Sequence, residues 1–524
     1  MSVFGIAVCK ISAQKGAAIL LSGAVLLLCS SLVRAVPGSL DITFGGTGMR
    51  SADFGTGSGF AKAVAIQSDG KLVTAGYFGD FTSQAVALAR FNTDGTLDAT
   101  FDGDGKVTTS ILGADDIAAG LVIQPDGKII VAGHSLNGLV YHFALVRYNS
   151  NGSLDTSFDG DGIVTTAFGL YDSFANAVVI QADGKIVAAG SSYNGTNFDF
   201  AIVRYLSTGS LDAGFDGDGK LTTAVLGDDD AVNAVAIQTD NQIVAIGYAS
   251  TGLANRFAAA RYNSNGSLDT TFDTDGKIIT SIGSIDDGAS DVVLQTDGKI
   301  VLAGFAHNGT TYDIALARYA SNGLLDTTFD SDGLVTTPVL AGNSFAHTIS
   351  LQSDGKLVVA GAVDNGVDYD LALARYGANG SLDVTYSGDG KATFDLDSLD
   401  NLGYASAIDS FGRVVVAGES GTTFMVARIL GDLNPSSAAV AVSGRITTAG
   451  GLGIRNARVT LTDVHGTSRY ALTGAFGFYR FEEVTVGGSY VISVASKKYD
   501  FLEPTQLITV TEKLGEVDFT AAGF

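Results

Sequence analysis

Tryptophan is absent from this chain of 524 residues, and only five prolines, five histidines and two cysteines are present. Cys9 and Cys29 both lie in the first 35 residues, so the rest of the chain can form no disulfide. Its stability must come from buried apolar surface, which a chain of this length can supply. No His-x-x-Glu pair occurs, and this excludes the zinc site that such a pair forms.

Residues 1–35 have the pattern of an export signal. Lys10 and Lys15 precede an uncharged apolar run, Gly16–Val33, and Ala35 ends a small-residue cleavage site. One alternative is an uncleaved membrane anchor, because about 18 apolar residues are just enough to span a bilayer. Lipid attachment at Cys29 is disfavoured, since the preceding Leu28 stands where a small residue is expected. We expect cleavage and an exported protein that is extracellular, cell-surface or periplasmic.

Negative charge dominates the rest of the chain. Without residues 1–35 there are 28 basic and 55 acidic residues, a net charge of −27. From Ala441 onward eight basic and eight acidic residues balance, so the whole excess lies before that point. Those earlier acids are aspartates, which favour turns, with Glu419 as the one exception. Such a surface repels nucleic acid and anionic lipid, and we expect neither as a partner.

A repeat of 57 residues runs through this acidic part. A Leu-Asp-x-x-aromatic motif, an Asp-Gly-Lys turn and a single glycine recur at the same interval. The motif begins at Leu40, Leu97, Leu154, Leu211, Leu268, Leu325 and Leu382, and the glycines are Gly76, Gly133, Gly190, Gly247, Gly304, Gly361 and Gly418. Seven units of strand-like composition at this period predict a β-propeller with one unit per blade.

Each unit is expected to form four strands. In the second unit these are Gly120–Gln124, Lys128–Gly133, His142–Asn149 and Gly162–Phe168. We expect continuously apolar strands, because neighbouring blades cover both faces, and an Asp-capped helical turn at Leu154–Phe158.

The phase of the repeat predicts how the ring closes. The chain starts with an outer strand near Met49–Phe54, and its last unit ends after a third strand, Met425–Leu430. The N-terminal strand should therefore complete the last blade and leave no open sheet edge.

Two resemblances support an all-β fold, a seven-bladed β-propeller at residues 36–432 followed by a small transthyretin-like β-sandwich. The lines LDTTF, QTDGKIVLAG and IALARY, at Leu325, Gln295 and Ile314, resemble the delta-60 repeat of bacterial secreted and surface proteins. That resemblance covers residues 40–432 and implies a propeller-like domain without a common chemistry.

After an expected linker at residues 433–440, residues 441–524 resemble a carboxypeptidase regulatory-like domain, which implies the sandwich. Gly444, Gly477, Tyr479 and Phe481 are among the residues that carry the resemblance. Alternating apolar residues at 458–462 and 490–494 independently favour half-buried strands.

No residue set specifies a catalytic site, a metal site or a cofactor. The histidines fall at unrelated positions: His134, His142, His307, His347 and His465. Quinone-dependent propellers are rich in tryptophan, which is missing here. Phe-Asp-Gly-Asp-Gly runs at Phe101, Phe158 and Phe215 suggest calcium loops, but the further oxygen ligands are lacking and we favour plain Asp-Gly turns.

An arginine recurs once in every unit, from Arg90 to Arg428. A ring of anion-binding arginines is one interpretation. We favour a structural one, in which each arginine pairs with the Leu-Asp aspartate of its own blade or with nearby carbonyls and holds the outer strand.

Variation is concentrated at one end of the blades. The Asp-Gly-Lys and Asn-Gly turns are nearly unchanged, whereas the loops after the repeated glycine differ and lie at the opposite end, beside the entries to the inner strands. We predict a ligand-binding surface there, formed by Asp115, Asp172, Asp229, Asp286, Asp400, Tyr193, Tyr312 and Tyr369. Carboxylates beside aromatic rings favour a cationic or hydroxyl-rich ligand. Unconstrained variation of exposed loops would also explain the differences.

These observations favour a non-catalytic binding, adhesion or surface scaffold protein with an extracellular protein or glycan as its partner. The alternative is a propeller enzyme, lactonase- or lyase-like, that uses central aspartates and a divalent metal.

Overall fold

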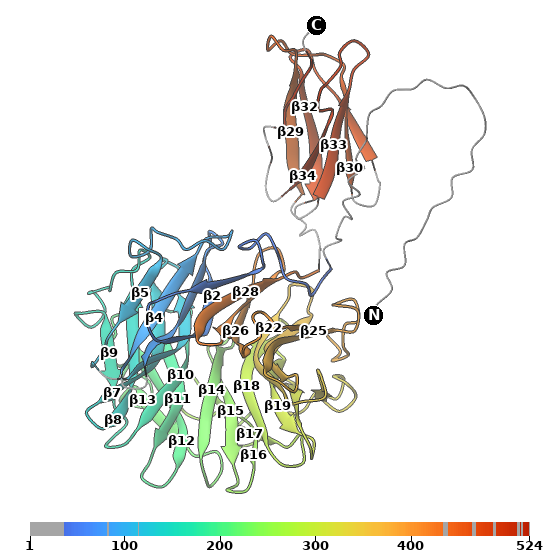
Figure 1. Cartoon of the computed structure of the whole chain (residues 1–524). Helices are drawn as coiled ribbons and strands as arrows, with labels where there is room; N and C mark the ends of the chain where they lie inside the picture. The colour runs from blue at the N-terminus through green and yellow to red at the C-terminus, as the bar shows by residue number, and fades with distance from the viewer. Residues whose placement is uncertain are drawn as a thin grey trace. The chain divides into compact units, whose positions relative to one another are not determined.

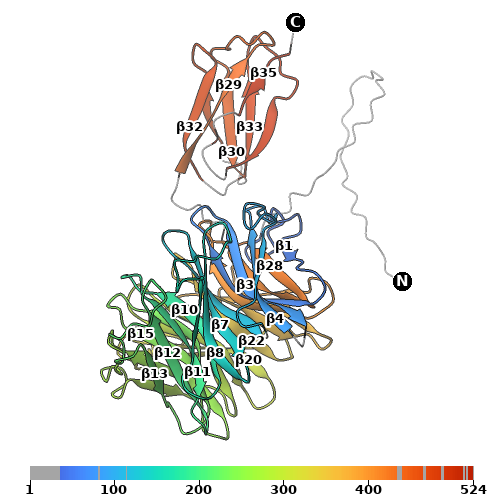
Figure 2. The ribbon, with the colours of Figure 1, turned by 90° about the vertical axis from the view of Figure 1, so that its left-hand side faces the viewer.

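The computed structural model of the chain describes residues 36–522, except 81–82, 114, 433–438, 464–467, 486–488, 511–513 and 515–516. The expected export signal and most of the expected linker therefore lie outside the described residues. Figures 1 and 2 show a ring of blades and a smaller sandwich, both built from strands. The described residues contain no helix, and so none that is long and apolar enough to cross a membrane.

Seven four-stranded antiparallel sheets form the ring, which confirms the predicted propeller. The inner strands are β2 (Ser58–Ile66), β6 (Asp116–Ile123), β10 (Ser173–Ile180), β14 (Asp230–Ile237), β18 (Asp287–Leu294), β22 (Ser344–Leu351) and β26 (Asn401–Ile408). The second strands are β3 (Leu72–Asp80), β7 (Ile129–Asn137), β11 (Ile186–Tyr193), β15 (Ile243–Ser250), β19 (Ile300–His307), β23 (Leu357–Asp364) and β27 (Val414–Ser420). The third strands are β4 (Ser83–Phe91), β8 (Val140–Tyr148), β12 (Phe198–Tyr205), β16 (Asn255–Tyr262), β20 (Tyr312–Tyr319), β24 (Tyr369–Tyr376) and β28 (Thr423–Ile429). The outer strands are β5 (Lys106–Thr109), β9 (Ile163–Thr166), β13 (Lys220–Thr223), β17 (Lys277–Thr280), β21 (Leu334–Thr337), β25 (Lys391–Phe394) and β1 (Met49–Ala52).

The inner strands surround the axis of the ring, because each contacts the next and β26 contacts β2. The second and third strands are buried along most of their length, as β7 and β8 illustrate. This confirms the prediction of continuously buried strands for the two middle strands of a blade. The prediction is wrong for inner and outer strands such as β6 and β9, where burial alternates because the two faces of the strand are covered to different extents.

The repeated glycine is explained by a bulge in the inner strand. In β6 the register shifts between Ala118 and Gly120, and the carbonyl oxygen of Ile117 approaches β7. A Cβ atom on Gly133 would lie 1.8 Å from that oxygen, so no other residue fits. Every blade has this bulge, and every equivalent glycine has the same close approach, at 1.8–2.0 Å.

The predicted helical turn at Leu154–Phe158 is wrong. Leu154 is extended and bridges to Tyr148, and the backbone then passes through two tight turns. Asp155 does cap this segment, since its Oδ1 accepts a hydrogen bond from the Ser157 amide at 3.1 Å. The capping aspartate was therefore identified correctly, but it starts an Asx turn rather than a helix.

The N-terminal strand completes the last blade, as the phase of the repeat predicts. β1 pairs with β28, with Met49 opposite Ala427. Before β1, Asp41 accepts a hydrogen bond from the Arg428 guanidinium at 2.8 Å, and the ring of Phe44 is fully buried beneath the same guanidinium. The first and last units are thus joined by a sheet, an ion pair and a buried aromatic ring.

The C-terminal part is the predicted sandwich of two sheets. Its strands are β29 (Ala439–Thr447), β30 (Arg458–Asp463), β31 (Ser468–Leu472), β32 (Phe478–Thr485), β33 (Ser489–Ala495), β34 (Thr505–Thr509) and β35 (Phe519–Thr520). One sheet has the order β32-β29-β35 and the other β31-β30-β33-β34, around a core that includes Val459, Phe481 and Ile492. β29 begins at Ala439, inside the segment expected as linker.

Candidate functional site

The two ends of the ring differ in their connections. One end, called here the turn end, carries the turns between first and second strands and the segments between third and outer strands. The other, called the loop end, carries the loops between second and third strands and the entries from an outer strand to the next inner strand. This is the division that the sequence predicts.

At the turn end the repeated polar residues bind one another. Arg204 Nε donates to Asp212 Oδ2 at 2.8 Å, its Nη1 donates to the carbonyl oxygen of Ser264 in the next blade, and its guanidinium lies 4.6 Å from the centre of the Phe215 ring. Arg90, Arg147, Arg261 and Arg318 repeat this arrangement. The structural interpretation of the arginines is therefore confirmed, with an additional bond to the neighbouring blade.

The Phe-Asp-Gly-Asp-Gly runs form turns. Asp102 has a positive φ of 50°, and Oδ1 of Asp104 accepts a hydrogen bond from the Lys106 amide at 2.9 Å, which caps the outer strand. Asp161 and Asp218 make the same bond. Among the described residues, no three histidine, cysteine, aspartate or glutamate side chains lie together as a metal ion would require.

Removing calcium is accordingly expected to leave the fold unchanged, because these aspartates are already engaged in turns. Addition of a chelator should shift the melting temperature by less than about 2–4 °C, the effect of 1 kcal/mol on a large domain. A fall of about 10 °C, reversed by calcium but not by magnesium, would instead support calcium loops.

The predicted aspartates of the loop end lie between blades. Oδ1 of Asp172 accepts a hydrogen bond from the backbone amide of Tyr141, in the preceding blade, at 2.9 Å. Asp229, Asp286 and Asp400 make the equivalent bond to Phe198, Asn255 and Tyr369. Two blades lack the aspartate and carry Ser58 or Asn343 instead, and Asn343 accepts the same bond from Tyr312 at 3.1 Å. One carboxylate oxygen is thus used to join blades, and an asparagine can replace it there.

Asp115 and Asp286 also face tyrosine hydroxyls. The hydroxyl of Tyr141 donates to Asp115 Oδ2 at 3.1 Å, and that of Tyr312 lies 3.5 Å from Asp286 Oδ2. These carboxylates raise the pKa of both tyrosines, although burial of the rings is the larger cause.

The three predicted tyrosines are half-buried members of two aromatic clusters. Tyr312 and Tyr369 both contact Phe345, at centroid distances of 5.2 and 6.4 Å. Tyr193 belongs to the other cluster and packs edge-on against Tyr171 at 5.5 Å. The structure therefore brings Tyr312 and Tyr369 together and keeps Tyr193 apart from them.

Three loop tips of this end carry almost fully exposed aliphatic side chains. Leu139, Leu253 and Val367 are 94%, 95% and 91% exposed and occupy one equivalent position in their units. These tips therefore present apolar side chains to the solvent at the loop end.

Sequence reasoning missed a polar cluster near the axis, where blade 7 (β26, β27, β28, β1) meets blade 1 (β2–β5). Nζ of Lys62 lies 3.2 Å from the centre of the Tyr404 ring, and the Tyr404 hydroxyl donates to Glu419 Oε1 at 2.8 Å. The His347 ring stacks on the Tyr404 ring, with 5.4 Å between the two ring centres. A signal was available: Glu419 is the one glutamate of the ring, and Lys62 is its one lysine outside the two repeated lysine positions.

Burial dominates the electrostatics of this cluster. It lowers the pKa of Lys62 to about 8, against the attraction of Glu419, and it raises the pKa of the Glu419 carboxyl above its usual value. It also lowers the pKa of His347. These shifts favour the neutral forms of all three side chains.

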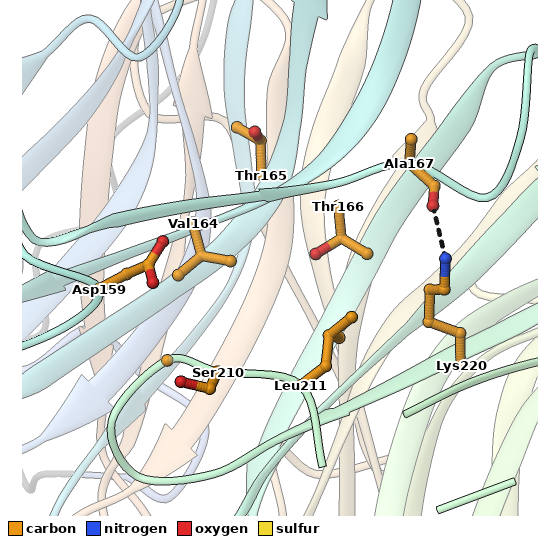
Figure 3. A pocket seen from close by; sticks show the side chains of 9 residues that line it. Asp159, Val164, Thr165, Thr166, Ala167, Ser210, Leu211 and Lys220 are labelled. Carbon is orange, nitrogen blue, oxygen red and sulfur yellow. Dashed lines mark hydrogen bonds between the residues drawn. The ribbon is translucent and has the colours of Figure 1, made fainter. Parts of the chain in front are cut away.

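The pocket in Figure 3 lies elsewhere, between the outer strands β9 and β13 of neighbouring blades. Its volume is about 300 Å³, and it is lined by residues 159, 164–167, 209–211 and 220. Lys220 donates to the carbonyl oxygen of Ala167 there at 3.1 Å, and Lys277 makes the equivalent bond in the next blade. Since its polar contact recurs around the ring, this pocket is not a distinctive site.

Two protein families match the chain. The domain of unknown function (DUF5122) beta-propeller matches residues 67–101, 124–158, 181–215, 238–272, 295–329 and 352–386, and the carboxypeptidase regulatory-like domain matches residues 441–521. Both predicted resemblances, to propeller repeats and to the regulatory-like domain, are confirmed. No curated protein matches the chain.

Several solved structures are distantly similar. A catalytically inactive virginiamycin B lyase from Staphylococcus aureus with quinupristin is 11% identical, with a TM-score of 0.40 over 73% of this chain and 99% of that one. The gluconolactonase XC5397 from Xanthomonas campestris is 15% identical, with a TM-score of 0.33 over 62% and 93%. The polysaccharide lyase Uly1 is 12% identical, with a TM-score of 0.41 over 71% and 90%. Similarity at these values does not bear on activity.

Proposed function

Because the chain carries DUF5122 β-propeller repeats and a carboxypeptidase regulatory-like domain, we propose that it is an exported, non-catalytic binding protein whose partner meets the loop end of the propeller. The contrast between the two ends carries this proposal. At the turn end the same residues recur and bind one another, so that end offers no distinctive surface. At the loop end the loops differ, and they present exposed aliphatic tips, half-buried tyrosines and carboxylates.

The chemistry of the loop end favours a cationic or hydroxyl-rich partner, such as a glycan or a basic segment of an extracellular protein. Asp229 and Asp400 are exposed, and each carboxylate uses Oδ1 for the bond to the neighbouring blade. The other oxygen can accept hydrogen bonds from a ligand while Tyr193, Tyr312 or Tyr369 packs against its apolar face.

The test is a glycan and protein array probed with the purified chain, followed by titration of the ligand found. Changing Asp172, Asp229 and Asp286 together to asparagine should weaken binding about tenfold or more, because hydrogen bonds to charged groups contribute about 1.5–3 kcal/mol. The melting temperature should hold, since Asn343 shows that an asparagine keeps the bond between blades.

A matched control removes the same charge from the turn end by changing Asp104, Asp161 and Asp218 to asparagine. These residues cap outer strands through Oδ1, which asparagine retains. This variant should bind as the unchanged protein does. Equal affinity of both variants and the parent would place the binding site elsewhere, for instance on the sandwich.

The alternative is a lactonase- or lyase-like enzyme that holds a divalent metal near the axis. Metal analysis of the purified protein distinguishes the two. Stoichiometric metal that is lost when Asp172, Asp229 and Asp286 are changed would favour the enzyme.

A further inference from the structure

Lys62 differs from the other lysines of the propeller. Nine of them donate to a carboxylate or a backbone carbonyl: Lys71, Lys106, Lys128, Lys185, Lys220, Lys277, Lys299, Lys356 and Lys391. No such acceptor for Lys62 is found within the described part of the chain. Its Nζ lies instead over the face of Tyr404, at 3.2 Å from the ring centre, and 5.9 Å from the centre of the Phe60 ring.

Closure of the ring creates the surroundings of this amine. Lys62 is the bulged residue of β2, the first inner strand, whereas Tyr404 is the bulged residue of β26, the last one. Glu419 follows the repeated glycine on β27 and is 7% exposed. Its Oε1 is bound to the Tyr404 hydroxyl, while its Oε2 has no hydrogen-bond partner among the described residues.

The fold does not need these residue types. At the bulge the other five units carry Ala119, Asn176, Asn233, Ser290 and His347. Asn176 and Asn233 bond the carbonyl of the next blade at 2.8 Å, and His347 Nδ1 lies 2.9 Å from the equivalent carbonyl oxygen of Gly403. An amine without an acceptor and a buried carboxyl with a free oxygen are costly by comparison. Such groups are retained where chemistry uses them.

We propose that Lys62 is a carbonyl-reactive amine, which binds a small aldehyde or ketone as an imine between blades 7 and 1. The neutral amine attacks the carbonyl carbon and forms a carbinolamine. The carbon–oxygen bond then breaks, the hydroxyl leaves as water with a proton from the Glu419 carboxyl, and the nitrogen loses a proton to restore that carboxyl. No oxidant or reductant is needed, and the proposal does not depend on what binds at the loop end.

The electrostatics of the cluster support this chemistry. With a pKa of about 8, roughly one Lys62 amine in ten is neutral at pH 7, against fewer than about one in a thousand for an ordinary lysine. Tyr404 and Glu419 favour the charged amine and offset part of this effect. His347, Tyr77 and Asp400 are the other titratable groups of the cluster, and His347 is also kept neutral by burial.

Competitive labelling of the intact chain tests the proposal without any variant. The protein is treated at pH 7 with limiting propanal and cyanoborohydride, which traps imines as propyl amines, and each lysine is quantified by peptide mass spectrometry. Lys62 should be labelled about tenfold faster than Lys71, Lys128 and Lys185, and its rate should level off above about pH 8. Burial alone predicts the opposite order. Labelling of Lys62 at or below the rate of those lysines would overturn the proposal.

Two variants identify the groups involved. Glu419→Gln removes the proton donor and should slow labelling of Lys62 while leaving Lys185 unchanged. Tyr404→Phe keeps the ring but frees Glu419, and Lys62 should remain the fastest lysine. If Glu419→Gln leaves the Lys62 rate unchanged, the role of the carboxyl is wrong, and the wild-type competition still decides the role of the amine.

Discussion

Deletion of residues 40–54 is expected to yield a protein that aggregates or melts at least about 10 °C below the intact chain. The deletion removes β1, and β28 becomes an exposed sheet edge. It also leaves Arg428, which is 3% exposed, without Asp41, and a broken buried pair costs about 3–5 kcal/mol. Loss of the fully buried Phe44 adds about 3–5 kcal/mol. Thermal melting and light scattering measure both effects.

A synthetic peptide of residues 40–54 provides the control. Added to the truncated protein, it should pair with β28 and raise the melting temperature, whereas a peptide in which Asp41 and Phe44 are alanine should not. Equal melting temperatures for the truncated and intact proteins would show that the N-terminal strand does not close the ring.

The architecture could be predicted because the sequence repeats the same unit seven times. The number of Leu-Asp motifs gave the number of blades, and the phase of the repeat gave the pairing of β1 with β28. The structural role of the arginines followed from their recurrence at one position in all seven units, and the pair of Arg147 with Asp155 is an example. Local geometry was less accessible: Leu154 pairs with Tyr148 across the turn, and this bridge prevents the helical turn that its spacing to Phe158 suggests.

The candidate site was harder to predict because it depends on differences between units. The hydrogen bond from the Tyr141 amide to Asp172 joins neighbouring blades, and it cannot be predicted from the sequence of a single unit. Lys62 and Glu419 are separated by almost the whole propeller sequence and meet only through ring closure. Contacts that recur in every unit could therefore be predicted from the repeat, whereas the contacts of Lys62 and Glu419 could not.

Substitution of Arg204 by alanine is expected to destabilise the propeller by about 3–5 kcal/mol, because it leaves Asp212 buried without its closest cation. It also removes the donor to Ser264 in the next blade and the contact with Phe215. Burial tends to raise the pKa of Asp212, but the Gly214 amide and the Arg204 guanidinium outweigh it and hold that pKa below its usual value. The carboxylate thus stays ionised in the folded protein, and its stabilising effect is present above about pH 4 and lost as the pH falls through the lowered pKa.

Lys185→Ala is the matched control for Arg204→Ala, because Lys185 pairs with the same aspartate at 3.4 Å from a side chain that is 31% exposed. A pair of that kind contributes less than about 1 kcal/mol. Urea denaturation at pH 7 should therefore separate the two variants clearly. The deficit of Arg204→Ala relative to the parent should shrink below about pH 4, where Asp212 of the unfolded chain begins to protonate while that of the folded parent is still ionised. Equal denaturation midpoints for the two variants at pH 7 would mean that the repeated arginines do not fasten blade to blade.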